Sequence, residues 1–143
     1  MKNAYSTYKT ANIDTADQGK LIIIAYDVAI KNCKLALNLF HNDHTEIEER
    51  SKYLYKIQDA VGELMGSLNL EVGEISQNLY KLYDYMIRRV IEAMVKKDPK
   101  PVTEVLGYLT DLRDAWKVAI DQTKEENAVN PNALRTKTIA VSG

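Results

Sequence analysis

Residues 79–94, with the sequence LYKLYDYMIRRVIEAM, decide the fold, because they place two apolar stripes along one expected helix. The first stripe contains Leu79, Leu82, Met86, Val90 and Ala93, and the second contains Tyr80, Tyr83, Ile87, Ile91 and Met94. At about 100° per residue, the first stripe is sufficient to face a bundle core, and the second widens the apolar arc to roughly half of the helix. This surplus predicts that something besides the core covers the second stripe.

Residues 21–40 likewise carry more apolar surface than a core-facing stripe requires, since their polar residues are confined to a narrow strip. Leaving a large aliphatic side chain exposed forgoes about 1.5–3 kcal/mol of burial. Three or four such residues would therefore forgo an amount comparable with a domain's whole stability of about 5–15 kcal/mol. The alternative is that neighbouring helices hide more of this surface, and that single exposed apolar residues are ordinary.

Helical periodicity recurs along most of the chain, while strand alternation never exceeds a few residues, so the sequence predicts an all-α fold. The expected helices cover residues 17–42, 45–69, 74–97 and 99–126. Asp17 is the expected N-cap of the first helix, and Thr45 with Glu48 forms a capping box for the second. Because the connections are short, the helices are expected to form an antiparallel up-down four-helix bundle.

The residues that end one helix and begin the next are clearest on the two sides of the third expected helix. Gly73 offers the turn that precedes it, and the run Asp98-Pro99-Lys100-Pro101 stops it and starts the fourth. We expect one domain over residues 1–126, in which residues 1–16 form an N-terminal cap segment. Residues 127–143 mix Asn, Pro, Thr and Ser with few large apolar groups, which is typical of a flexible tail, and no function is assigned to them.

The cap segment has an apolar pattern of its own, in which Tyr5, Tyr8 and Ile13 recur with Ala4 and Ala11 at spacings compatible with a short amphipathic element. It is too short to be a stable helix alone. We therefore interpret it as a displaceable lid, which binds the bundle weakly and gives way to a longer amphipathic peptide.

Composition excludes several classes of function. The chain has 143 residues, with 19 basic against 20 acidic ones and a net charge of −1, which gives no electrostatic footprint for nucleic acid. Its longest apolar run, residues 21–26, is far shorter than the roughly 20 residues of a membrane span. No secretory signal pattern is present at the N-terminus, so we expect a cytoplasmic protein without membrane insertion. The single cysteine, Cys33, is expected to be a packed thiol in a reducing compartment.

Catalytic and metal-binding patterns are weak. His41, Asp43 and His44 have ligand types that suit zinc, but their spacing is not a helical pair and no further Cys or His completes four ligands. There is no phosphate-binding Gly loop and no serine elbow. The sequence therefore predicts neither an enzyme nor a metal site, and no cofactor.

Three blocks of the chain resemble a known family. They are NAYSTYKTANIDTADQGKLIIIAYDVAI, LNLEVGEISQNLYKLYDYMIRRVIEAMVKKD and EVLGYLTDLRDAWKVAI, which together span residues 3 to about 121. These blocks resemble the flagellin export chaperone (FliS) family. The most specific parts are residues 82–86, followed by Arg88 and Arg89, and the later block Asp114-Ala115-Trp116-Lys117.

The resemblance implies an antiparallel helical bundle that holds the disordered C-terminal segment of flagellin, prevents premature polymerisation and brings the subunit to the flagellar export apparatus. The implied groove residues are Leu21, Ile22, Tyr26, Tyr83, Ile87 and Ile91, with Tyr5, Tyr8 and Ile13 as the displaceable cap. Core packing is the alternative for each groove residue. Trp116 is favoured as a core residue over a partner anchor. The alternative function is a helical adaptor for other flagellar regulatory or export proteins.

The chain also departs from the family's common pattern. Gln18 stands where the family commonly has Pro, and Ala25-Tyr26-Asp27-Val28 stands in place of Leu-Tyr-Asp-Gly. Val28 is bulkier than Gly and Ala25 is smaller than Leu, so the local packing of the groove is expected to differ.

Overall fold

The computed structural model describes residues 15–40 and 47–129 of the chain, and in these ranges it contains four helices and no strand. They are α2 (Thr15–Leu39), α3 (Ile47–Gly66), α4 (Glu74–Lys96) and α5 (Lys100–Val129). The predicted all-α four-helix architecture is confirmed. The cap residues Tyr5, Tyr8 and Ile13 and the capping residue Thr45 lie outside the described residues.

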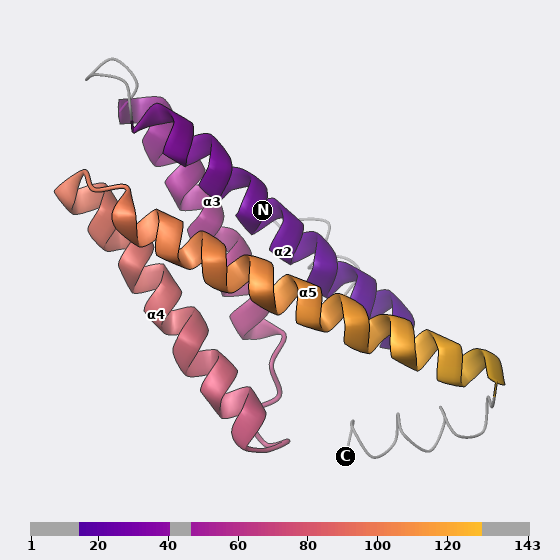
Figure 1. Cartoon of the computed structure of the whole chain (residues 1–143). Coiled ribbons are helices and arrows are strands. Elements are labelled where there is room, and N and C mark those ends of the chain that lie inside the picture. Colours follow the sequence, from indigo (N-terminus) through magenta and orange to yellow (C-terminus); the bar gives the residue numbers. More distant parts are fainter. Residues whose placement is uncertain (1–14, 41–46, 130–143) are drawn as a thin grey trace.

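The helices form a bundle in which each one packs mainly against two others: α2 and α4 each lie against both α3 and α5. Successive helices run in opposite directions, and α2 lies beside α3 and α5 along much of its length (Figure 1). By contrast, α4 and α5 are close where they are connected and diverge toward their other ends (Figure 1). The bundle is therefore closed at the α4–α5 connection and splayed at the opposite end of that pair.

The core takes one face from each helix, and small residues on α2 allow close packing. Its fully buried members include Tyr26, Ala29, Cys33, Ala36, Leu54, Ile57, Val61, Tyr83, Met86, Val90, Val102, Val105 and Leu109. As predicted, Cys33 is a buried free thiol, and burial raises its pKa to about 12. A thiol that stays protonated at neutral pH packs as a small apolar group.

The turns before and after α4 lie at the residues where the sequence predicted them. Gly73 has φ 141° and ψ −166°, a conformation essentially restricted to glycine, and it stands directly before α4. At the other end, Lys97 adopts the left-handed conformation with φ 54°, and its backbone N–H donates to the Ala93 carbonyl. The Asp98 carboxylate then accepts from the backbone N–H of Lys100 at 3.0 Å, which stabilises the start of α5.

The observed helix ends differ slightly from the predicted ones. α3 ends at Gly66, before the predicted end at 69, because the Ser67 hydroxyl donates to the Leu64 carbonyl at 2.7 Å and Asn69 accepts from the N–H of Glu71. These local side-chain bonds compete with the helical ladder. α5 continues to Val129, beyond the predicted end at 126.

Candidate protein-binding surface

Two of the predicted groove residues meet in the interior. Tyr26 and Tyr83 are both buried, their hydroxyls form a hydrogen bond, and their ring centroids are 6.5 Å apart. Burial raises the pKa of Tyr26 well above its usual range, the neighbouring Tyr83 raises it further, and the Trp116 side chain acts in the opposite direction. This pair connects α2 with α4 across the bundle, and in this conformation both rings face the core rather than the surface.

The other predicted groove residues lie nearer the surface, in two places. Leu21 is buried and Ile22 is half-buried near the start of α2. On α4, Ile87 is half-buried and Ile91 is 43% exposed. The structure thus separates the six predicted residues into an interior pair, a site near the start of α2 and a stripe on α4.

The α4 stripe, defined here as Tyr80, Ile87 and Ile91, faces away from α5. Residues 85 and 89 contact α5 through Glu104, and residue 87 lies two positions from each, a rotation of about 200°. Tyr80 and Ile91 are both exposed. The predicted surplus of apolar surface on this helix is therefore present in the folded bundle, and the described residues leave it partly uncovered.

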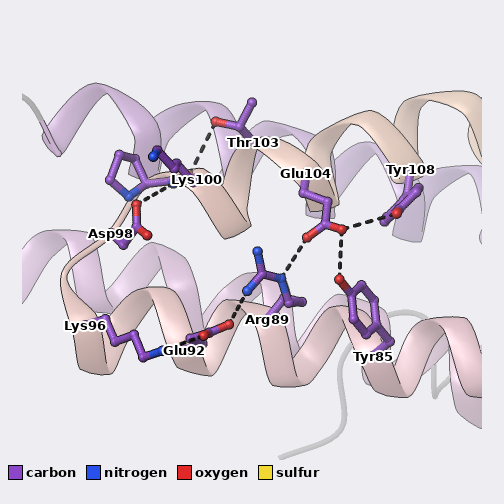
Figure 2. A network of polar contacts seen from close by, with 10 residues as sticks. Tyr85, Arg89, Glu92, Lys96, Asp98, Lys100, Thr103, Glu104 and Tyr108 are labelled. Atoms are coloured by element: carbon purple, nitrogen blue, oxygen red, sulfur yellow. Dashed lines mark hydrogen bonds and ion pairs between the residues drawn. The ribbon is translucent and has the colours of Figure 1, made fainter.

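A polar network holds the other side of α4 against α5 near their connection (Figure 2). The Arg89 guanidinium donates to Glu104 at 2.7 Å and also pairs with Glu92, while the Tyr85 and Tyr108 hydroxyls both donate to Glu104, at 2.8 and 3.2 Å. The Arg89 hydrogen bond lowers the pKa of the Glu104 carboxyl, and the Tyr85 hydrogen bond adds to this effect. The network fixes how α4 and α5 are joined.

Nothing in the sequence analysis indicated this network. A separate surface pair on α4 joins Asp84 and Arg88, four residues apart, at 2.7 Å, and both side chains are solvated. The Glu104 contacts were missed because they join residues 15 to 19 positions apart across a turn, where helical spacing gives no signal. The available signal was the presence of opposite charges, Arg89 and Glu104, on the two helices that the Asp-Pro run connects.

Several exposed apolar residues were also missed. Ile75 at the start of α4 is 77% exposed, and Val118 on α5 is 57% exposed. Trp116, which was predicted to pack in the core, lies partly buried against it. The apolar surface is thus spread over more than one helix, which suits an extended ligand better than a compact one.

The described residues offer neither a metal-binding cluster nor a membrane-spanning helix. Within residues 15–40 and 47–129, no group of three Cys, His, Asp or Glu side chains could hold a metal ion. The cluster of His41, Asp43 and His44 lies outside the described residues. No described helix is long and apolar enough to cross a membrane.

A four-helix bundle with a partly exposed apolar stripe on α4 and further exposed apolar residues on α5 has the features of a protein-binding module. Comparison with known proteins identifies the family. The family model described as "Flagellar protein FliS" matches residues 1–123. The chain belongs to the FliS family.

Curated relatives carry the same description. The flagellar secretion chaperone FliS of Bacillus subtilis (strain 168) is 36% identical over 126 residues, which cover 88% of this chain and 92% of the relative. The flagellar secretion chaperone FliS of Escherichia coli (strain K12) is 29% identical over 74% of this chain and 78% of its own length. Its counterpart in Vibrio cholerae is 26% identical over 81% of this chain and 88% of its own length. The resemblance found in the sequence blocks is therefore confirmed, and the family supports a role in flagellar export.

Proposed function

We propose that this chain is a cytosolic export chaperone that binds the disordered C-terminal segment of flagellin, prevents its premature polymerisation and delivers it to the flagellar export apparatus. Membership of the FliS family supports this proposal. The observation that carries it is the partly exposed apolar stripe of Tyr80, Ile87 and Ile91 on α4. The exposed area of this stripe adds nothing to the stability of the bundle alone, whereas a peptide that becomes helical on binding can bury it.

In this proposal some of the predicted groove residues contact the partner, and others hold the helices in position. Ile22, Ile87 and Ile91 contact the flagellin segment, because they retain accessible surface. Tyr26 and Tyr83 hold the positions of α2 and α4 from inside the bundle. Several apolar anchors supply the affinity, since no single polar contact can repay the cost of ordering a disordered peptide.

Calorimetric titration with the C-terminal segment of the organism's own flagellin tests the proposal. We expect one-to-one binding with a gain of helix by circular dichroism and a negative heat-capacity change. Ile91→Gln should weaken binding by about tenfold, because loss of apolar burial on the order of 1.4 kcal/mol has that effect.

Ile24→Gln is the matched control for this titration. Ile24 is the same residue type, on α2, and is 47% exposed against 43% for Ile91. The control should change affinity by less than about twofold. Equal weakening by both substitutions would show that the α4 stripe has no special part in binding.

Tyr5, Tyr8 and Ile13 form the displaceable cap in this proposal. A chain lacking residues 2–14 should bind the flagellin segment more tightly, because an intramolecular competitor has been removed. The lid interpretation is wrong if the deletion leaves both affinity and thermal stability unchanged.

The alternative is an adaptor that binds other flagellar regulatory or export proteins through the same surface, which the apolar residues on several helices also suit. Competition separates the two functions. A flagellin segment that displaces every other partner supports the chaperone groove, whereas simultaneous binding shows a second adaptor surface.

A further inference from the structure

The polar network between α4 and α5 holds α4 at two successive turns through one carboxylate. The Arg89 guanidinium donates to Oε1 of Glu104 at 2.7 Å, and the Tyr85 hydroxyl donates to Oε2 at 2.8 Å (Figure 2). We name these three residues the clamp. Because the two carboxylate oxygens are held from residues one turn apart, the clamp opposes rotation of α4 about its own axis as well as its separation from α5.

The ion pair of the clamp is better shielded than the neighbouring surface pair. The Arg89 and Glu104 side chains are 26% and 29% exposed, whereas the Arg88 side chain, paired with Asp84, is 76% exposed. Glu92 also pairs with Arg89 and holds the guanidinium along α4. The hydrogen bond to Glu104 is the largest of the effects that raise the pKa of Arg89. Partial burial reduces screening by salt, so this pair constrains α4 more than the Arg88 pair does.

The clamp and the α4 stripe lie on opposite edges of the core-facing side of α4. Measured from the fully buried Met86, Ile87 and Ile91 lie about 100° and 140° away around the helix in one direction. In the other direction, Arg89 and Tyr85 lie about 60° and 100° away. The clamp edge faces α5, and α3 is the other main neighbour of α4, so the stripe borders the α3 side.

Apolar burial by itself favours a different rotation of α4. Ile91 is 43% exposed and lies about 40° farther from the core than the half-buried Ile87. Turning α4 by that angle toward α3 would bring Ile91 to the present position of Ile87 and remove apolar area from water. The same turn moves a side chain at about 5 Å from the helix axis by roughly 3.5 Å, which separates Arg89 from Glu104. The clamp therefore opposes burial of the stripe.

We propose that the clamp is a positioning device, which holds α4 in the rotation that keeps the α4 stripe accessible to a partner. Arg89 and Tyr85 face α5, so they act through the orientation of the helix and do not touch the partner. That the flagellin segment binds the stripe rests on the proposed function. The effect of the clamp on the exposure of the stripe does not.

Thiol labelling of the full chain tests the proposal. With the clamp intact, the thiol of Ile91→Cys should react readily with a maleimide. Adding Arg89→Leu should slow this reaction at least about threefold, because residue 91 turns toward α3. Tyr85→Phe removes one hydrogen bond of the clamp without changing any charge, and it should slow the reaction in the same direction. The native thiol of Cys33 is fully buried, so its labelling reports any loss of the fold.

Two matched controls separate rotation from other effects. Arg88→Leu removes the same charge from the adjacent residue, whose partner Asp84 lies on α4 itself, and it should leave the reaction at position 91 unchanged. Val95→Cys places a thiol at a site on α4 that is 74% exposed, and Arg89→Leu should not slow its labelling. Unchanged or faster labelling at position 91 in both clamp variants would overturn the proposal, as would equal slowing at position 95.

Titration with the flagellin segment gives a second readout. Arg89→Leu should weaken binding several-fold while Cys33 stays protected, and Arg88→Leu should not. Equal affinities of these two variants would overturn the positioning role. The labelling contains no flagellin, so slower labelling at position 91 supports the clamp even if the wild-type chain does not bind the segment, a result that would contradict the proposed function alone.

Discussion

Removing one hydroxyl from the buried tyrosine pair should destabilise the bundle without weakening partner binding. Tyr26→Phe removes the hydrogen bond between the Tyr26 and Tyr83 hydroxyls, in a core where Tyr83 is 1% exposed. Loss of one hydrogen bond between buried side chains costs about 1–3 kcal/mol. Tyr83→Phe should cost a similar amount for the reciprocal reason.

The double variant distinguishes a specific pair from two independent losses. With both hydroxyls absent, two apolar rings face each other, and the Trp116 side chain beside Tyr26 also loses a hydrogen bond. We expect the double variant to lose no more than about the larger single loss. The resulting coupling equals at least the smaller single loss, about 1–3 kcal/mol, which is within the range for residues in direct contact.

Urea unfolding measures these values conveniently. The chain contains one tryptophan, so its fluorescence reports on the region of the pair, and circular dichroism reports on the whole bundle. With a slope of about 1–3 kcal/mol per molar urea, a loss of about 2 kcal/mol shifts the midpoint by roughly 1 M. Tyr55→Phe is the control, because Tyr55 is an exposed tyrosine on α3, and it should shift stability by less than about 0.5 kcal/mol.

Two results would refute this reasoning. If the double variant loses the sum of the single losses, the hydroxyls do not depend on each other. If Tyr26→Phe leaves stability unchanged but weakens flagellin binding more than tenfold, the hydroxyl faces the partner, and the buried conformation is not the one that binds.

Three further predictions follow from the α4 turns and the α4–α5 network. Gly73→Ala should destabilise the bundle by about 1–3 kcal/mol in urea unfolding, because φ 141° is strained for alanine; an unchanged midpoint would contradict this. Lys97→Gly should stabilise it by up to about 1 kcal/mol, because a left-handed residue at φ 54° favours glycine, and a lower melting temperature would count against that account. The pKa of Glu104 is lowered by Arg89, so its stabilising contribution is present above the pKa of an unfolded carboxyl and is lost as the pH falls through the folded value. Glu104→Gln should therefore flatten the acid side of the stability profile, and an identical profile would refute the assignment.

The sequence was sufficient to predict the number and order of helices because their apolar spacing and turn residues agree. Gly73 and the Asp-Pro run occupy the turns that they were predicted to make, and Cys33 is buried as expected. Local patterns of this kind depend only on residues a few positions apart. They are therefore readable without knowing how the helices are arranged.

The positions of the groove residues depend on that arrangement and were not fixed by the pattern. Tyr83 lies about 60° from the core residue Met86 around α4, and Ile87 lies about 100° from it. A helical wheel shows both as apolar, yet the first is buried and the second only half-buried. The boundary between them is set by how far the neighbouring helices reach. The divergence of α4 and α5 could not be predicted for the same reason, since it is not encoded in the residue spacing of either helix alone.

Residues 82–91 therefore contribute to the core, to the contact with α5 and to the exposed stripe. Because successive residues are about 100° apart, Tyr83, Met86 and Val90 face the core, residues 85 and 89 face α5, and residues 87 and 91 face outward. The three sets alternate so closely that inserting one residue after Met86 would rotate everything beyond it by about 100°. Ile91 would then move away from the exposed stripe and Arg89 away from Glu104, while the composition would be almost unchanged. The order of residues in this block, rather than its apolar content, thus connects the packing of the bundle to the surface that it offers a partner.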